Sequence, residues 1–460
     1  MLTDIRGLRL TTDSEAAVTH YNAAIANYFE YRLATGKCLK RALEADPDFV
    51  MGHCLRGYLF MLFGSTAFHD RTEKAVAFAE ARADRVTRRE AVHIAALRAW
   101  LMGDLPRTCA LWDEILVEHP RDLLALRLQH FNYFWMGRAA ALRGGPAGVL
   151  DAWDETVPGF GYVLGMLAFG LEECGDYAEA EAKGRQAVEI NPEDLWAIHA
   201  VAHVLEMQGR LSEGIAWLDY PAEAWADRNP FRGHLWWHAA LFPLERGDYD
   251  RALALYDRSI RTATSDFYLD IQNAASLLYR LEFQGIDVGD RWAELADHVE
   301  TRTDDHVLAF TDAHCMMALS AAGRTQTARR LLASLTDFAK TPGNTAAGTM
   351  TPVTIPLCEA ILAYGEGDYE RTVERMLPLR GALACLGGSH AQRDIFAQIL
   401  LESAIRGGRL KLARVLLSER VSLKPRSYGT WAKYAEVLEG LGEAEAAAAA
   451  RRRGGELKTA

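Results

Sequence analysis

The pattern of apolar and polar residues along the chain predicts helices rather than strands. No segment alternates between apolar and polar residues for long enough to form part of a sheet. Instead, the tripeptide Gly-Asp-Tyr occurs three times, at 175–177, 247–249 and 367–369. Glycine suits the tight turn between two helices because it adopts backbone conformations that other residues avoid. Each tripeptide therefore marks the turn of a predicted helical hairpin.

Glycines at similar intervals continue this pattern toward both ends of the chain, and we call the whole set the anchors. The anchors are Gly64, Gly103, Gly137, Gly175, Gly209, Gly247, Gly285, Gly323, Gly367, Gly408 and Gly442. They lie 34 to 44 residues apart, and several are followed 17 residues later by a proline, which can end the second helix of a hairpin. The chain of 460 residues also exceeds the ~250–300 residues of a usual single core, as repeat arrays do. The pattern predicts an all-α solenoid of about eleven helical hairpins.

The hairpins resemble the tetratricopeptide repeat, a helix–turn–helix unit of about 34 residues. The segments 176–192 (DYAEAEAKGRQAVEINP) and 248–260 (DYDRALALYDRSI) match its second helix closely. The resemblance covers nearly the whole chain and includes an N-terminal pair that ends in RALEADP (41–47). It implies a right-handed superhelical solenoid of tetratricopeptide-like hairpins, forming a single unit over residues 1–460. Spacings of 38 residues exceed that unit and imply longer helices or loops in part of the array.

The central region resembles one subfamily in particular, the tetratricopeptide repeat protein 38-like proteins. The segments that carry this resemblance are 196–210 (WAIHAVAHVLEMQGR), 234–253 (HLWWHAALFPLERGDYDRAL), 276–285 (SLLYRLEFQG), 311–319 (TDAHCMMAL) and 389–394 (SHAQRD). These strings are more specific than the general repeat pattern. The resemblance implies a soluble protein with a long helical-repeat fold, and it carries over no activity and no catalytic residues.

Two segments interrupt the repeat. The segment 341–352 (TPGNTAAGTMTP) is rich in Thr, Gly and Pro, which predicts an exposed loop. The segment 387–394 (GGSHAQRD) places a Gly-Gly turn before the start of a helix. Either segment could act as a lid, although most insertions of this kind are tolerated surface loops.

Composition and charge exclude several classes of partner. The formal net charge of −11 disfavours nucleic acid, because phosphate binding needs concentrated Lys and Arg. No apolar run approaches the ~18 residues of a membrane helix, and the first residues lack the apolar core of a signal peptide. The seven cysteines lie far apart without a CxxC pair, as is typical of a reducing compartment. We therefore expect a cytoplasmic protein without a nucleic-acid or membrane partner, and its oligomeric state stays open.

Histidines four residues apart occur twice within 191–320, the region on which we centre the candidate site. His199 pairs with His203, and Glu206 lies one turn later. His234 pairs with His238 in the next hairpin. Residues i and i+4 share one face of a helix, so each pair presents both imidazoles together. With each anchor set at repeat position 15, the first three residues take positions 5, 9 and 12, which face the concave groove in tetratricopeptide arrays. The second pair takes groove position 2 and position 6, at the groove edge.

Three interpretations of these residues stay open. As metal ligands, the four histidines would bind a divalent ion such as zinc, iron or nickel, although an HExxH motif is absent. As catalytic groups, the set would perform acid–base chemistry near neutral pH. As packing residues, the imidazoles would fill space between long helices. The proximity of a carboxylate favours a functional groove over packing. The predicted catalytic residues are His199, His203, Glu206, His234 and His238, and the four histidines are the candidate metal ligands.

Further residues are expected to bind a ligand in the same groove. One histidine, His93, falls at repeat position 5 of an earlier hairpin. Trp237 would supply an apolar wall. His314, preceded by Asp312, falls at position 6 of a later repeat, at the groove edge or against a neighbouring helix, whereas His390 and Arg393 open a helix that could close the superhelix over the same space. The predicted ligand-binding residues are His93, Trp237, Asp312, His314, His390 and Arg393.

The leading functional hypothesis is a concave groove that binds a small polar ligand at the His/Glu cluster, with acid–base or metal-assisted histidine chemistry. This hypothesis favours an enzyme of undetermined reaction class, with a divalent metal ion as one candidate cofactor. The alternative is a non-catalytic tetratricopeptide scaffold for a protein or peptide partner, the commonest use of helical repeats. A peptide-carboxylate clamp would want Lys, Arg and Asn at positions 2, 5, 9 and 12, where this chain has histidine, glutamate and aliphatic residues. A small-molecule ligand is therefore favoured.

Overall fold

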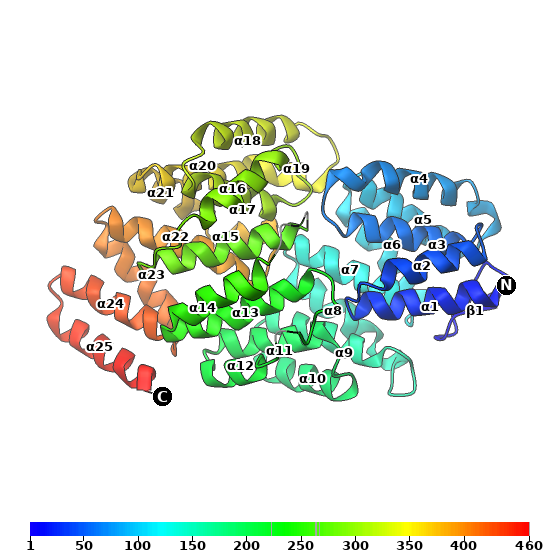
Figure 1. Cartoon of the computed structure of the whole chain (residues 1–460), viewed down its shortest axis with the longest axis horizontal. Coiled ribbons are helices and arrows are strands. Elements are labelled where there is room, and N and C mark those ends of the chain that lie inside the picture. Colours follow the sequence, from blue (N-terminus) through cyan, green and yellow to red (C-terminus); the bar gives the residue numbers. More distant parts are fainter. Residues whose placement is uncertain (222, 263–264, 266, 460) are drawn as a thin grey trace.

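The chain folds as an all-α helical-repeat solenoid of antiparallel helix pairs (Figure 1). The computed structural model describes residues 1–221, 223–262, 265 and 267–459. The first helices of the anchored hairpins, called A helices, are α3 (Val50–Met61), α5 (Arg88–Leu101), α7 (Leu123–Trp135), α9 (Phe160–Glu173), α11 (Leu195–Met207), α13 (Phe231–Arg246), α15 (Tyr268–Glu282), α17 (Ala309–Ala321), α20 (Ile355–Gly365), α22 (His390–Arg406) and α24 (Tyr428–Gly440).

The second helices of these hairpins are called B helices. They are α4 (His69–Glu80), α6 (Leu105–Glu118), α8 (Ala139–Val149), α10 (Tyr177–Ile190), α12 (Leu211–Trp217), α14 (Tyr249–Leu255), α16 (Arg291–Val299), α18 (Thr325–Phe338), α21 (Tyr369–Met376), α23 (Leu410–Leu423) and α25 (Ala444–Thr459). Several of them, such as α4, α10, α18 and α25, lie at the edge of the view in Figure 1. One further pair, α1 (Glu15–Phe29) and α2 (Thr35–Ala45), precedes the first anchor, and a short helix α19 (Thr345–Thr349) precedes α20.

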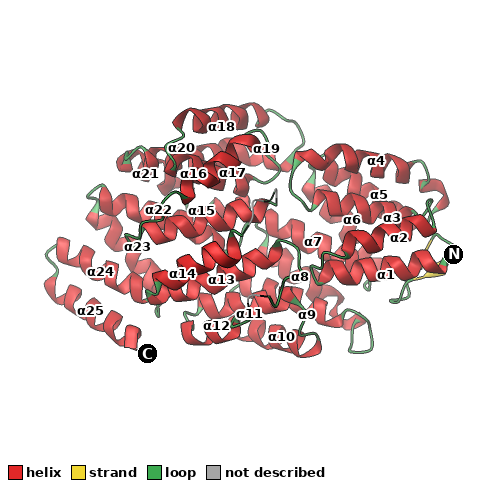
Figure 2. Cartoon of the chain, viewed as in Figure 1, coloured by secondary structure: helices red, strands yellow, loops and turns green. Residues whose placement is uncertain are grey.

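Little else in the described residues is regular structure (Figure 2). Two short strands, β1 (Leu2–Thr3) and β2 (Arg9–Leu10), pair antiparallel near the N-terminus. The short helical turns are η1 (Thr66–Phe68), η2 (Ala83–Arg85), η3 (Leu150–Ala152), η4 (Tyr256–Ile260), η5 (Glu300–Arg302), η6 (Met350–Thr354), η7 (Leu377–Leu379) and η8 (Leu383–Leu386). The prediction of an all-α solenoid is therefore confirmed.

The anchors explain why the hairpins form where they do. All eleven have positive φ, from 60° at Gly64 to 85° at Gly175 and Gly247. Each anchor ends an A helix in the left-handed conformation that glycine adopts at low cost. The pair α1 and α2 turns instead at Tyr31, whose φ is 58°, and this is the one described non-glycine residue with positive φ.

The concave face of the solenoid is filled by the chain itself, so the expectation of an open groove is wrong. Helix α22 contacts α11 and α15, and α24 contacts α13. The guanidinium of Arg280 donates to the carbonyl of Ala391 at 2.8 Å, across more than one hundred residues of sequence. The physical reason is that the central A helices bury their inner face as well as their outer one: α15, for example, is buried along almost its whole length. Such helices need cover on their inner face as well.

The segment 341–352 differs from the predicted exposed loop. Helix α19 begins at Thr345, and Met350 is fully buried. The backbone of Thr345 donates to the carbonyl of Gly103 at 2.9 Å, and its hydroxyl accepts from the backbone of Leu105 at 3.0 Å. This segment therefore joins two distant parts of the superhelix. The second segment, 387–394, forms the predicted Gly-Gly turn before α22.

One apolar stretch escaped the sequence analysis. Within the described residues, the helical stretch Thr345–Gly365 is long and apolar enough to cross a membrane, with a mean hydropathy of 1.3. Within the most apolar part of this stretch, 56% is buried inside the protein. The mostly buried core helix of a soluble protein passes the same test. The expectation that no apolar run reaches this length was therefore wrong.

Candidate metal centre

Four histidines from two neighbouring A helices converge on one point inside the protein. His199 and His203 come from α11, and His234 and His238 come from α13. Each offers one ring nitrogen to a group whose members all lie within 4.8 Å of one another. The exposed fractions of these residues are 2%, 0%, 3% and 0% respectively. We call this group the tetrahistidine cluster.

Local sequence sets the positions of these side chains. Asp194 caps the start of α11 by accepting from the backbone amides of Trp196 and Ala197, at 3.0 and 3.1 Å. This cap fixes where α11 begins and therefore which face His199 and His203 share. Helices α11 and α13 pack against each other as consecutive A helices, so the two faces meet.

Three of the four imidazoles have an outer polar neighbour at Nδ1. His238 Nδ1 lies 3.1 Å from Glu206 Oε2, and His234 Nδ1 lies 2.8 Å from Asn273 Oδ1. His203 Nδ1 lies 3.5 Å from Glu172 Oε2, which is an electrostatic contact rather than a hydrogen bond. Outer contacts of this kind orient the ring and direct Nε2 inward, as they do around protein-bound metal ions.

Burial keeps the imidazoles neutral. Desolvation is the largest cause that lowers the pKa of each of the four histidines, and repulsion from neighbouring imidazoles adds to it in the cases of His199, His203 and His238. The pKa of His234 falls to about 4, although Asn273 and Glu206 act against the shift. The neutral imidazole is the form that binds metal ions.

The pKa of the nearby carboxyl group of Glu172 shifts upward, whereas the pKa values of the histidines shift downward. Desolvation first, and then the charges of Glu173 and Glu206, raise its pKa well above the usual value. Glu172 is fully buried, so the metal-free protein favours its protonated form over the carboxylate. This group can release a proton when a cation arrives.

Several buried polar atoms around the cluster have no hydrogen-bond partner. They include Nε2 of His238, Nδ1 of His199 and both carboxyl oxygens of Glu172. Each such atom costs about 1–3 kcal/mol when it is left unpaired. Unpaired atoms are uncommon in folded proteins, and a group of them at one point indicates a ligand that would satisfy them.

The spacing of the ring nitrogens fits a bound ion. The Nε2 atoms of His199 and His203 lie 3.0 Å apart. A tetrahedral ion at about 2.0–2.1 Å from each nitrogen holds the nitrogens roughly 3.3–3.4 Å apart. The observed separations, from 3.0 Å to the 4.8 Å limit of the group, bracket that value. Small rotations of the rings would therefore create a four-nitrogen site.

A cavity of about 100 Å³ adjoins the cluster, and we call it the inner cavity. His199 and His234 line it, whereas its other walls are mostly aromatic. Arg127 also lines it. The inner cavity holds several water-sized groups, which is room for the end of a small molecule beside the two histidines.

The structure brings together six of the predicted site residues. The four histidines meet Glu206 through His238, and Trp237 stacks on His234 with ring centroids 5.2 Å apart and planes at 10°. Trp237 is 1% exposed, so it packs behind the cluster rather than against an open groove. The catalytic and ligand-binding roles of these residues stay predictions.

His93 lies elsewhere, contrary to its predicted place in the same groove. Its Nε2 is 3.0 Å from Asp122 Oδ2, and its Nδ1 is 3.1 Å from the hydroxyl of Tyr58. Arg89 pairs with the same carboxylate at 2.6 Å. Despite burial, His93 and Arg89 lower the pKa of Asp122. This group binds the N-terminal hairpins together, so repeat phase alone did not identify a ligand-binding residue.

Asp312 and His314 also lie outside the tetrahistidine cluster. Asp312 Oδ1 is 2.9 Å from Nδ1 of His306. His314 Nδ1 donates to the carbonyl of Phe310 at 2.8 Å, one turn earlier in α17. Each side chain therefore has a structural partner within its own part of the fold, and the ligand-binding role of both stays a prediction.

His390 and Arg393 close the superhelix, as expected, but through Glu173. His390 Nε2 lies 3.0 Å from the carbonyl of Glu173, and Arg393 Nη2 lies 3.4 Å from its carboxylate. Glu173 follows Glu172, so these contacts border the cluster without entering the inner cavity. Glu172, Glu173 and His203 form a second group of potential ligand atoms.

Sequence reasoning missed four residues around the site: Glu172, Asn273, Lys424 and Arg127. The repeat position could have identified two of them. Glu172 lies three residues before an anchor, as Glu206 does, and Arg127 lies ten residues before an anchor, as His199 does. Lys424 donates to Glu206 Oε1 at 3.4 Å from the far end of the chain, and no local pattern announces that contact.

Comparisons with known proteins concern the fold. No family model matches the chain. A chain of Naa15/Naa10 bound to HypK-THB is 18% identical, with a TM-score of 0.26, over 95% of this chain and 62% of that one. A human IFIT1 dimer with PPP-AAAA is 14% identical, with a TM-score of 0.41, over 97% of this chain and 95% of that one. The P58(IPK) TPR domain is 12% identical, with a TM-score of 0.22, over 80% and 93% of the respective chains.

This chain therefore spans less than two thirds of the first of these neighbours. The helical-repeat fold follows from the helix pairs and anchors of this chain itself, and the resemblance to tetratricopeptide repeats and to the 38-like subfamily stays a prediction. None of the three likenesses bears on the tetrahistidine cluster, whose chemistry has to be argued from its own geometry.

Proposed function

We propose that this protein binds one divalent first-row transition-metal ion in the tetrahistidine cluster and presents it to a small molecule in the inner cavity. The observation that carries the proposal is the convergence of four buried, neutral imidazoles within 4.8 Å. Imidazole suits zinc, iron, nickel and copper, and four nitrogen donors without a thiolate match that group of metals.

The outer residues support this proposal by balancing charge. A divalent cation in a closed interior needs negative charge nearby, because burying an isolated ion is costly. Glu206, at 3.1 Å from His238, and Glu172, at 3.5 Å from His203, would supply two negative charges. Glu172 would lose its proton as the ion binds, so uptake of the metal would release protons.

The position of the inner cavity supports a functional rather than a purely structural ion. His199 and His234 belong to the cluster and also line the inner cavity, so a fifth ligand of the ion would enter from the cavity. An ion held there would act as a Lewis acid or redox centre on a bound small molecule. The chain's own groups, Glu206 and Glu172, would hold or accept protons through the imidazoles that they contact.

The filled concave face favours this proposal over a scaffold for a peptide. Tetratricopeptide scaffolds hold an extended peptide in an open groove. Here α22 and α24 occupy that space, and the residues at groove positions 5, 9 and 12 of α11 are at most 5% exposed. A protein partner would have to use another surface.

Metal analysis tests the proposal. The protein would be purified without chelators, and its metal content would be measured before and after dialysis against zinc, iron, nickel or copper. We expect about one ion per chain in the wild type and a loss of more than about tenfold in affinity in His203→Ala and His238→Ala. His314→Ala is the matched control, because His314 is equally buried but lies outside the cluster.

Fewer than about a tenth of an ion per chain in the wild type, unchanged by added metals, would reject the proposal. Equal metal binding by the wild type and both cluster variants would also reject this location for the ion.

A further inference from the structure

The inner cavity contains a buried cation without an acidic partner. Arg127 is 6% exposed, and its guanidinium lies over the ring of Trp196 at 4.1 Å. Its Nη2 donates to the hydroxyl of Tyr31. Within the part of the chain that the structure describes, no carboxylate forms an ion pair with it. A buried charge that lacks a counter-charge is destabilising, so such a residue usually serves a ligand.

Asp194, the acid whose charge acts on Arg127, does not neutralise it fully. Asp194 is fully buried, and desolvation raises its pKa to about 7 despite the amides of Ala197 and Trp196 and the charge of Arg127. Its Oδ1 caps α11. At neutral pH this carboxyl group is therefore only partly ionised, and a positive charge remains beside the inner cavity.

The neighbouring Tyr31 is held in an unusual conformation that points its hydroxyl to Arg127. Its φ of 58° is rare for a bulky residue and strains the backbone. Its ring stacks on Phe231 with centroids 4.1 Å apart and planes at 11°. The backbone of Asn229 donates to its carbonyl at 2.6 Å. The fold therefore stabilises this side chain at the wall of the cavity.

An apolar groove of about 770 Å³ leads to the same place, and we call it the outer groove. It lies against α2 and α3, and its apolar walls include Leu33, Leu39, Leu43, Leu59, Phe60 and Phe63. The outer groove and the inner cavity share Tyr28, Leu62, Asn229 and Phe267 as lining residues. The two spaces therefore adjoin at these four residues.

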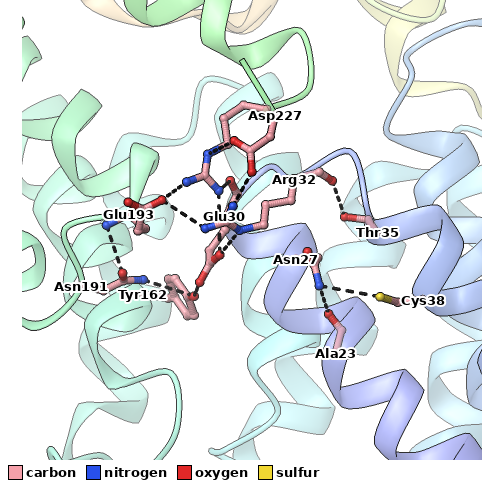
Figure 3. A network of polar contacts seen from close by, with 11 residues as sticks. Ala23, Asn27, Glu30, Arg32, Thr35, Cys38, Tyr162, Asn191, Glu193 and Asp227 are labelled. Carbon is pink, nitrogen blue, oxygen red and sulfur yellow. Dashed lines mark hydrogen bonds and ion pairs between the residues drawn. The ribbon is translucent and has the colours of Figure 1, made fainter. Parts of the chain in front are cut away.

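The first cation at the rim of the outer groove is already paired. Figure 3 shows Arg32 among the carboxylates of Glu30, Glu193 and Asp227. Tyr162 donates to Glu30 at 3.2 Å and extends this network toward α9. Because its charge is satisfied, Arg32 is a poor anchor for an anionic ligand.

Two further cations line the outer groove: Lys40, which pairs with Glu44 at 3.6 Å, and Arg56. Arg56 contacts the imidazole of His53 at 2.8 Å and has no carboxylate partner in the described residues. It is half-buried, whereas Arg127 is deeply buried beside the cluster. The two arginines therefore define opposite orientations for an anionic molecule, and the better desolvated of them, Arg127, gives the stronger charge-assisted hydrogen bonds.

We propose that the small molecule recognised here is an amphipathic monocarboxylate, with its carboxylate on Arg127 and Tyr31 and its apolar chain in the outer groove. The guanidinium is a planar donor that matches a carboxylate in a bidentate arrangement. The mostly apolar walls of the outer groove match an aliphatic or aromatic chain. This assignment rests on the proposed function in one respect: the carboxylate end lies beside His199 and His234, where the metal would act.

Binding of dodecanoate, with dodecan-1-ol as the uncharged probe of equal length, tests the assignment. Affinities would be measured by tryptophan fluorescence, because Trp135 and Trp196 line the inner cavity, and by calorimetry below the concentration at which dodecanoate forms micelles. We expect the wild type to bind dodecanoate at least about tenfold more tightly than dodecan-1-ol, since a charge-assisted hydrogen bond is lost with the alcohol.

Three variants locate the carboxylate. Arg127→Gln should weaken dodecanoate by about tenfold or more and leave dodecan-1-ol nearly unchanged. Arg56→Gln should change either affinity by less than about threefold, because Arg56 lies farther out in the outer groove. Leu62→Trp should weaken both probes, because it fills the junction of groove and cavity. If Arg127→Gln fails to fold, Leu62→Trp and Arg56→Gln still test the route and the orientation.

Equal affinities of the wild type for the acid and the alcohol would overturn the assignment. So would a larger loss in Arg56→Gln than in Arg127→Gln, or unchanged binding in Leu62→Trp. The metal content of each variant separates this inference from the proposed function. If no metal binds but dodecanoate follows the expected order, the metal proposal fails alone; if Arg127→Gln retains metal and dodecanoate affinity, the ligand assignment fails alone.

Discussion

His199 and His203 face each other through their Nε2 atoms at 3.0 Å, one turn apart on α11 and sealed from solvent. Two neutral imidazoles at this distance make a single hydrogen bond, in which one ring donates and the other accepts. The same distance is close to that between two neighbouring ligands of one metal ion. His238 Nε2 lies unpaired in the same cluster, and under our proposal a cation would complete the arrangement.

The tetrahistidine cluster should make the metal-free protein sensitive to acid. The folded-state pKa of His234 is about 4, below its usual 6.5, so the unfolded chain binds this proton more readily. Its contribution to stability is full above pH 6.5 and is lost as the pH falls toward 4. His234→Gln removes this titration. In chelator, the wild type should lose up to about 1.4 kcal/mol per pH unit more than His234→Gln across this window, measured by urea unfolding.

Parallel stability curves for the two proteins from pH 6.5 to 4 would contradict that prediction. The comparison with the variant is needed because buried carboxyl groups act in the opposite direction. Burial raises the pKa of Asp270 to about 6, for example, so its contribution is lost as the pH rises through that value.

Lys424 should stabilise the cluster from the far end of the chain. Its ammonium group lies 3.4 Å from Glu206, and both residues are buried. Lys424→Met leaves the carboxylate without this partner and should cost about 3–5 kcal/mol of unfolding free energy. Lys424→Met combined with Glu206→Gln should recover part of that loss, because the unpaired charge is gone. Lys340→Ala, which removes an exposed pair with Asp337, should stay within about 1 kcal/mol of the wild type. Additive losses in the double variant would show that the pair is not coupled.

His93 should behave as a structural residue. Its imidazole joins Asp122 and Tyr58 in the N-terminal core and is fully buried. His93→Ala should therefore cost roughly 2–4 kcal/mol in thermal or urea unfolding, through a cavity and lost hydrogen bonds. Metal content per folded chain should be unchanged. Loss of metal with unaltered stability would restore His93 to the site.

Gly137 should be essential to the closure of the superhelix. Its φ is +64°, and an added Cβ would lie 1.8 Å from the carbonyl oxygen of Ala384. Gly323 has a similar φ of +68° but no atom within 4 Å of that position. Gly323→Ala should cost about 1–2 kcal/mol from backbone strain alone. Gly137→Ala should cost at least about 1–3 kcal/mol more, because the backbone of the facing segment must move. Equal melting temperatures of the two variants would argue that this contact does not form in solution.

The anchors made the repeat predictable, because a left-handed glycine at a tight turn is a local requirement that sequence alone reveals. The i,i+4 spacing likewise predicted that His199 and His203 share a face. Repeat phase indicated which face is inward, but not what covers it. The contacts that fill the concave face join residues far apart, such as Lys424 with Glu206 and Arg280 with Ala391, and they depend on the accumulated curvature of many hairpins.

The same limit explains why repeat position 5 gave different outcomes. His93, Arg127 and His199 all lie ten residues before an anchor, yet only the last two line the inner cavity. The repeat position orients a side chain toward the inside of the solenoid. Whether that side chain contacts a carboxylate, a cavity or another imidazole depends on the residues of the neighbouring hairpins.

X-ray absorption at the metal edge tests the central claim most directly. The protein would be loaded with one equivalent of the metal that it retains on purification, and its spectrum would be compared with that of His203→Ala. The account predicts a first shell dominated by four nitrogen atoms at about 2.0–2.2 Å, with the outer-ring scattering of imidazole, and the loss of one such ligand in the variant. A first shell of sulfur or of oxygen alone, or a spectrum that is identical in the variant, would contradict it.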